Sequence, residues 1–281
     1  MLFGTAGVAQ AFAPSGAHPL TVGAMRLSVG AIALIIFVLA RGDTFGSVVR
    51  LWGSPAGLIA TAGAAAYQPF FFAGVARVGV PLGTLVAVGS APIFTGLLGW
   101  VWRRERPTGT WALATTICVA GLALLTGAGA QVGSLDGIAL TAGAGVSIAC
   151  YTVAAKSLLE SGVDAIGVCA ATFLLGSIVV LPFALGQGIG WALTGSGVLV
   201  ALYLGLATMA VANILYARGL LHLPPATAAT LGLADPVTAT LLGVLVLGQV
   251  VTPLGWLGFL GVVVGLVLQG AWAARTGRRE E

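Results

Sequence analysis

One carboxylic acid lies deep inside an apolar segment: Asp235, near the middle of residues 225–248 and directly before Pro236. If this segment crosses a bilayer, a charge at its centre costs about 2.5–3.5 kcal/mol, and residues retained at such a cost are usually functional. One interpretation makes Asp235 a counter-ion for an ammonium group or a proton carrier. The other makes it the N-cap of a half-helix that begins at Pro236. The two interpretations are compatible, and the sequence leaves both open.

A second group of polar residues lies within other apolar segments. Arg26 is the corresponding cation; its long side chain favours an interfacial anchor, and the alternative is a clamp for a carboxylate. Neutral hydrogen-bonding residues are predicted at comparable depth: Tyr67, Gln68, Tyr151, Asn213 and Tyr216. Each of them either joins two helices or contributes to a solute site. Together with Asp235 and Arg26, these residues are the candidate substrate-binding set.

The sequence lacks the motifs of nucleotide hydrolysis, of common hydrolases and of metal sites. It contains no G-x-x-x-x-G-K-[ST] loop, no H-E-x-x-H motif and no G-x-S-x-G motif, which argues against ATP hydrolysis and against familiar hydrolases. Cys118, Cys150 and Cys169 lie in apolar segments without ligand spacing, which indicates neither a disulfide framework nor a metal site. We therefore expect no enzyme activity, no cofactor and no metal.

The composition predicts an all-α integral membrane protein. Hydrophobic residues make up 58% of the 281 residues and charged residues 7%, and there are 43 glycines, whereas a soluble domain has about 25% charged residues and about 7% glycine. The formal net charge is +4, but no cluster of basic residues is interleaved with aromatic ones on a solvated domain, so nucleic acid is not an expected partner. The expected partners are the lipid bilayer and a small-molecule substrate.

Apolar runs of about 20 residues predict ten transmembrane helices. They fall near 1–14, 19–40, 54–77, 80–102, 109–128, 135–156, 163–186, 196–219, 225–248 and 253–274. The first is too short to cross a bilayer, so we expect it to be truncated or to enter only part of the way. The other links are short and leave no room for a further soluble domain.

The sequence also matches itself at a constant offset of 144 residues without gaps. The offset relates identical residues in the two halves: Gly23 and Gly167, Pro81 and Pro225, Pro92 and Pro236, Gly121 and Gly265. It predicts a first repeat over 1–128, a second over 135–274 and a charged tail over 275–281. Each repeat would hold five helices, an odd number, so the second is inverted in the membrane. Pro92 and Pro236 would then break helices four and nine at symmetric depths and act in gating.

The basic residues predict the orientation. Ten helices place on one side Arg41, Arg50, Arg103, Arg104, Arg106, Lys156, Arg218, Arg275, Arg278 and Arg279. Only Arg26 and Arg77 lie toward the other side. Because basic loops stay in the cytoplasm, we expect a multi-pass protein of the cytoplasmic (inner) membrane with both termini in the cytoplasm.

Several motifs resemble one transporter family along essentially the whole chain. Pro19, Arg26 and Gly30 fit a P-x(6)-R-x(3)-A/G helix opening. Residues 70–127 follow with Ala-Gly-Val-Ala-Arg-Val-Gly, the pair Ala91-Pro92, the pair Glu105-Arg106 and Gly121, and residues 223–270 repeat the pattern with Asp235-Pro236. These features resemble the EamA-type carriers of the drug/metabolite transporter superfamily.

Two departures from the family pattern are visible. The family usually has Trp-Gly in its first helix with further apolar residues before it, whereas Phe3-Gly4 stands here near the start. This difference supports the expectation of a truncated first helix. Gln249 replaces a frequent glutamate of the second repeat, so any role of that acid is absent.

The resemblance and the inverted repeat together imply a secondary transporter that works by alternating access. We expect export of amino acids or similar amphiphilic metabolites, because Asp235 and Arg26 would match the two charges of an amino acid. Drug efflux or metabolite uptake is the alternative, and a lipid scramblase or a membrane sensor is the alternative of another class. Proton coupling through Asp235 is a further expectation. The substrate, the coupling ion and the oligomeric state stay open.

Overall fold

The computed structural model describes residues 1–127 and 134–277, and within these ranges the chain is helical without any strand. Nine helical segments there are long and apolar enough to cross a membrane. Six of them are single helices: α2 (Pro19–Ala40), α4 (Pro55–Val78), α5 (Val80–Arg103), α6 (Gly109–Thr126), α7 (Leu135–Glu160) and α8 (Ala165–Leu185). A seventh, α13 (Pro253–Gly277), ends the described chain.

The two remaining segments are irregular. One consists of α9 (Gly195–Tyr203), the π-helix η5 (Leu204–Val211) and α10 (Ala212–His222). The other consists of α11 (Pro225–Gly232) and α12 (Ala234–Leu247), with a turn at Leu233 between them. Short elements complete the chain: η1 (Phe3–Thr5), α1 (Ala6–Ala11), α3 (Phe45–Arg50), η2 (Leu51–Gly53) and η4 (Gly190–Leu193).

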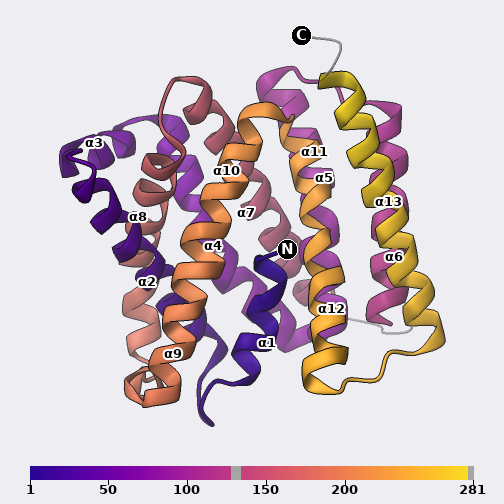
Figure 1. Ribbon diagram of the computed structural model, residues 1–281, viewed down its shortest axis with the longest axis horizontal. Coiled ribbons are helices and arrows are strands. Elements are labelled where there is room, and N and C mark those ends of the chain that lie inside the picture. The colour runs from indigo at the N-terminus through magenta and orange to yellow at the C-terminus, as the bar shows by residue number, and fades with distance from the viewer. Residues whose placement is uncertain (128–133, 278–281) are drawn as a thin grey trace.

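These elements confirm the prediction of an all-α membrane protein. Nine of the ten predicted spans correspond to helices of sufficient length, and the first predicted span contains only η1 and α1. The predicted repeat boundary at residue 128 and positions 278–281 of the predicted tail lie outside the described residues. Figure 1 places the N-terminus in the middle of the bundle, between α10 and α12, and the C-terminus at one end.

Small residues let several helices approach closely. A Cβ added to Gly63 of α4 would lie 2.5 Å from the Ser147 carbonyl oxygen of α7, and one added to Gly74 would meet the backbone of Thr141. At the far edge of the bundle, α6 and α13 lie side by side (Figure 1) and meet at Gly121 and Gly258. Such contacts replace the hydrophobic driving force that is absent between helices in lipid.

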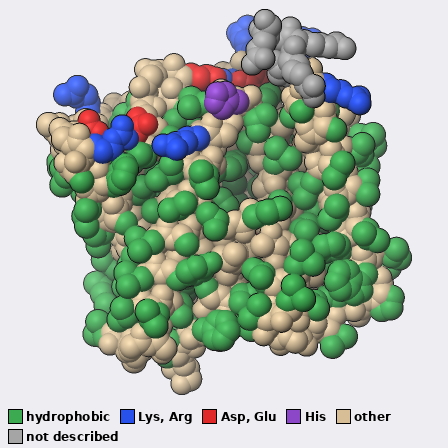
Figure 2. Space-filling view, in the orientation of Figure 1, with side chains coloured by type: hydrophobic (Ala, Val, Ile, Leu, Met, Phe, Trp, Pro, Cys, Tyr) green, Lys and Arg blue, Asp and Glu red, His purple; other side chains and the backbone are tan. Residues whose placement is uncertain are grey.

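The surface divides into an apolar body and one charged end. Figure 2 shows hydrophobic side chains over the sides of the bundle and charged side chains along one edge. At this end Arg103 of α5 contacts Glu160 of α7 at 2.6 Å, and Lys156 lies 3.3 Å from the same carboxylate. The Lys156 side chain is buried and donates hydrogen bonds to the carbonyl oxygens of Leu220 and Leu221 at the end of α10.

Candidate functional site

A cavity of about 1040 Å³ lies inside the bundle. The helices α2, α4, α5, α7, α10, α11 and α12 contribute to its lining, together with the N-terminal segment. The lining includes every residue of the candidate set: Arg26, Tyr67, Gln68, Tyr151, Asn213, Tyr216 and Asp235. Pro236 also lines the cavity, whereas Pro92, within the described chain, does not. Sequence reasoning thus selected side chains that the fold brings together from five helices.

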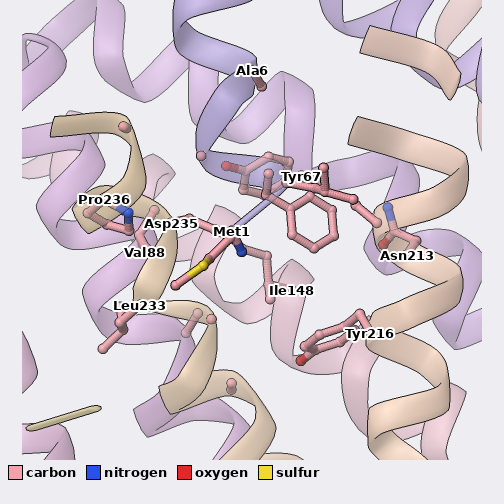
Figure 3. Close-up of a pocket in the computed structure, with 18 of the residues that line it drawn as sticks. Met1, Ala6, Tyr67, Val88, Ile148, Asn213, Tyr216, Leu233, Asp235 and Pro236 are labelled. Atoms are coloured by element: carbon pink, nitrogen blue, oxygen red, sulfur yellow. Dashed lines mark ion pairs between the residues drawn. The ribbon is translucent and has the colours of Figure 1, made fainter. Parts of the chain in front are cut away.

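Asp235 lies in the first turn of α12, beside the interruption of the helix. The helix begins at Ala234 with Leu233 as its N-cap, so the interpretation of Asp235 as the cap of a helix starting at Pro236 is wrong. The carboxylate is free for other contacts, and the amino group of Met1 lies 3.2 Å from its Oδ1 atom. Figure 3 shows Asp235 and Asn213 on opposite sides of the cavity, with Met1 and Tyr67 between them. The acid therefore accepts an ammonium group in this structure.

Arg26 of α2 contributes a cation to the same cavity. Its Nη2 donates to the carbonyl oxygen of Thr208 in η5 at 3.1 Å. Its buried Nε has no hydrogen-bond partner among the described residues. Asp235 lines the same cavity. A guanidinium turned into a cavity and bonded to a helix backbone does not have the arrangement of an interfacial anchor, which was the favoured interpretation of the sequence.

Three candidate side chains bond to neighbours while lining the cavity. Asn213 donates from Nδ2 to the carbonyl oxygen of Met209, one turn earlier, at 2.8 Å. The Tyr216 hydroxyl lies 3.2 Å from Thr152 Oγ1 of α7, so this pair joins two helices across the cavity wall. Tyr151 pairs its hydroxyl with the Cys169 sulfur of α8 at 3.9 Å. The predicted roles in helix contact and in cavity lining thus coexist.

Aromatic rings form much of the remaining wall. Tyr67 stacks on Phe71 with 5.6 Å between ring centroids, and Tyr151 stacks on Phe173 at 5.9 Å. The amide of Gln68, next to Tyr67, packs against Gly23 of α2. A Cβ added to Gly23 would lie 2.9 Å from the Cδ atom of Gln68. The cavity can therefore hold a solute with a cationic group, an anionic group and an apolar body.

Two contributors to the site were missed in the sequence. The Thr152 hydroxyl is hydrogen-bonded to the Tyr216 hydroxyl, and the carbonyl oxygen of Thr208 accepts a hydrogen bond from Arg26. Threonine in a helix usually bonds to its own backbone, so its residue type gives no signal of such a role. Which backbone carbonyl accepts a bond from a distant side chain depends on how the helices pack, so the residue type gives no signal there either. Among the described residues, no group of three or more His, Cys, Asp or Glu side chains could hold a metal ion.

Comparisons with known proteins agree on one family. The model of the "EamA-like transporter family" matches residues 1–127 and 135–270. The "Uncharacterized transporter YwfM" of Bacillus subtilis is 36% identical over 270 residues, which cover 96% of this chain and 90% of that protein. The "Uncharacterized inner membrane transporter YicL" of Salmonella typhimurium is 25% identical over 250 residues, with 87% and 82% covered.

A solved crystal structure shows the same fold. Its TM-score to this chain is 0.82 at 23% sequence identity, and the match covers 98% of this chain and 94% of the other. At this identity the likeness concerns the fold alone. The family and the relatives' names indicate a transporter rather than an enzyme.

Proposed function

Because the chain belongs to the EamA-like transporter family, we propose that it is a secondary carrier that exports amino acids or similar small amphiphilic solutes by alternating access. One observation carries the proposal: Asp235 and Arg26, which are 235 − 26 = 209 residues apart in sequence, line the same aromatic-walled cavity. An amino acid has one ammonium and one carboxylate group, which these two side chains complement.

Alternating access in such carriers comes from two inverted repeats, and we propose ten helices in this arrangement. Contacts between helices that the 144-residue offset relates support it. Cys118 of α6 donates from its sulfur to the carbonyl oxygen of Val262 of α13 at 3.6 Å, and the two positions differ by 144. The contact is reciprocal, because Gly121 packs on Val262 and Gly265 packs on Cys118. When two repeats are related by a two-fold axis, a residue near the axis contacts its equivalent in the other repeat, as these residues do.

The offset is not gapless, however, which corrects one expectation from the sequence. The side chains of Ser54 and Thr194 cap the starts of α4 and α9 in the same way, each accepting from a glycine N–H three residues later. These caps lie 194 − 54 = 140 residues apart. The segment α9–η5–α10 has 28 residues and α4 has 24, so the second copy carries four additional residues. The π-helix lies within this longer segment.

We further propose that the charged end of the bundle faces the cytoplasm and that the membrane is the inner membrane. The gathering of basic residues at that end supports the orientation, and the name of the relative YicL supports the location. Cysteine at Thr108, between α5 and α6, should resist an impermeant thiol reagent added to intact cells. Cysteine at Gln249, after α12, should react, and the reverse pattern would contradict the orientation.

A counterflow experiment tests the function. Proteoliposomes loaded in turn with each of the twenty L-amino acids should exchange at least one of them saturably with its labelled form. Asp235→Asn should slow this exchange about tenfold or more, as expected when about 1.4 kcal/mol of binding or coupling is lost. The matched control is Asp43→Asn, an exposed acid outside the cavity, which should exchange at the wild-type rate.

The alternatives give different results in the same vesicles. A scramblase would move labelled lipid without competition from solutes, and a drug carrier would exchange lipophilic cations but none of the amino acids. For proton coupling through Asp235, a pH gradient should accelerate the wild type but not Asp235→Asn. Equal rates, affinities and pH profiles of the two proteins would contradict a role of Asp235 in the site.

A further inference from the structure

The π-helix η5 leaves one carbonyl group outside the regular helical pattern. In an α-helix the N–H of Ala212 would bond to the carbonyl oxygen of Thr208, four residues earlier. Here it bonds to the carbonyl oxygens of Ala207 and Met209 instead. Single π turns inside α-helices are rare and often occur at functional sites. The Thr208 carbonyl therefore does not receive the donor that an α-helix would give it.

Two cavity side chains supply donors to η5. Arg26 donates from Nη2 to the carbonyl oxygen of Thr208, and Asn213 donates from Nδ2 to that of Met209. Unpaired backbone carbonyls are unfavourable inside a membrane, where no water replaces the lost partner. The Arg26 bond therefore gives the Thr208 carbonyl a donor in the π form, whereas the Met209 carbonyl already accepts from the Ala212 N–H as well as from Asn213. Both side-chain donors belong to the candidate binding site.

Close packing brings Arg26 within reach of η5. Gly30 of α2 faces the Met209 side chain and the Gly205 carbonyl of η5. A Cβ added to Gly30 would lie within 3.0 Å of η5, and a Cβ added to Gly205 would lie within 3.0 Å of α2. Arg26 lies one turn before Gly30. Since α2 and η5 approach at their backbones, a change in the winding of η5 must change its contact with α2.

The guanidinium is not fully satisfied by this bond. It has five N–H donors, and its buried Nε has no partner among the described residues. A carboxylate can accept two parallel bonds from a guanidinium, which a single carbonyl oxygen cannot. An anionic group in the cavity would thus compete favourably with Thr208 for Arg26.

We propose that η5 is a hinge controlled by the solute. Arg26 stabilises its π form through the Thr208 carbonyl, and an anionic group on the transported solute draws the guanidinium away. The segment then returns toward regular α-helical bonding, and α9 moves relative to α10. The inference rests on the proposed function in one respect, that the solute carries an anion. It explains how binding changes conformation, because a ligand shifts an equilibrium only through unequal affinity for the two states.

Distance measurement between spin labels tests the hinge directly. Leu199 of α9 and Leu215 of α10 are 69% and 55% exposed on either side of η5, so cysteines there accept nitroxide labels once Cys118, Cys150 and Cys169 are replaced by alanine. Pulsed electron resonance in liposomes gives the distribution of distances between the labels. Arg26→Gln should move the main peak of this distribution without any added solute, because the Thr208 carbonyl loses its donor.

Two controls exclude general effects of the substitution. Arg77→Gln removes an arginine that pairs with Asp136 outside the cavity and should leave the distribution unchanged. A second label pair at Leu257 and Val267, both exposed on the uninterrupted helix α13, should not respond to Arg26→Gln. Asn213→Ala removes the other donor and should move the Leu199–Leu215 peak in the same direction by a smaller amount.

A solute arm separates failure of the hinge from failure of the proposed function. In the wild-type labelled protein, the amino acid with the fastest counterflow should move the peak as Arg26→Gln does, and its carboxamide, which lacks the anion, should not. An unmoved peak in Arg26→Gln, or equal movement by acid and amide, overturns the hinge. If no amino acid exchanges, the proposed function fails while Arg26→Gln still decides the hinge. If Arg26→Gln does not fold, Asn213→Ala and the solute arm decide it.

Discussion

Helices α4, α5 and α7, on one side of the cavity, run without interruption, whereas the segments on the other side are interrupted at η5 and at Leu233. We call the first three helices the uninterrupted wall, and η5 with α10, α11 and α12 the interrupted wall. The uninterrupted wall is tied together by backbone contacts, at Gly63 with α7 and at Gly145 with the Ala87 carbonyl oxygen of α5. The interrupted wall also has one close backbone contact, between Gly205 of η5 and Gly30 of α2, but its η5 carbonyls accept bonds from the side chains of Arg26 and Asn213.

The difference indicates where the molecule can move. Helices in backbone contact cannot slide without clashes, because packed interiors are not continuously deformable. Helices whose carbonyls are bonded by side chains can exchange those partners. The interrupted wall carries Asp235, Asn213 and Tyr216, so the proposed solute-binding residues and the irregular backbone occur together there.

The largest predicted effect tests the rigidity of the uninterrupted wall. Gly63→Val should destabilise the protein by about 3 kcal/mol or more, the upper range for overpacking, because its Cβ would meet the backbone of Ser147 and Tyr151. Size-exclusion chromatography in detergent should then show aggregated protein. The control is Gly232→Ala at the end of α11, where nothing described lies within 4 Å of the added Cβ. A folded, monodisperse Gly63→Val protein would contradict the comparison.

The extents of the segments in both walls could be predicted from the sequence, but little of the local irregularity in the interrupted wall could. Apolar runs located α4, α5 and α7 within a few residues, because length and hydropathy alone determine a membrane helix. The π-helix gave no such signal, since Leu204–Val211 has the composition of an ordinary span and its winding depends on contacts from Arg26 and α2. The break before Asp235 was anticipated from Pro236, but its position at Leu233 was not.

The site residues were predicted better than their contacts. Polar side chains in apolar segments are few. The free-energy cost of placing them in a membrane is therefore enough to select Asp235, Arg26 and Asn213 as cavity residues. Their partners depend on helix rotation and packing, which a single sequence does not encode at this resolution. Lys156 illustrates the limit: it was predicted as a topology residue at a helix end, and it is buried against the α10 carbonyls.

An intermediate effect tests the connection between the walls. Lys156 of α7 donates to the carbonyl oxygens of Leu220 and Leu221 of α10, which the helix end leaves without intrahelical partners. Lys156→Met should cost about 1–3 kcal/mol, the penalty for leaving buried acceptors unsatisfied, and should lower the unfolding temperature in detergent. Glu160→Gln weakens the half-exposed ion pairs of this carboxylate with both Lys156 and Arg103 and should still cost less, about 1 kcal/mol or below. Equal losses would show that the ion pair, and not the α10 carbonyls, gives Lys156 its effect.

The smallest effect on stability, and the sharpest test of asymmetry between the walls, concerns the two prolines. Pro92 lies inside the continuous helix α5, whereas Pro236 follows the turn at Leu233, where it cannot donate to the Gly232 carbonyl oxygen. Pro236→Ala restores that donor and joins α11 to α12, so counterflow should slow while the unfolding free energy changes by about 1 kcal/mol or less. Pro92→Ala changes a residue of a helix that is already continuous, so this variant should exchange solute near the wild-type rate. Equal slowing by both variants would favour the symmetric kinks that the sequence repeat predicted, and an unchanged rate in Pro236→Ala would make the break incidental to transport.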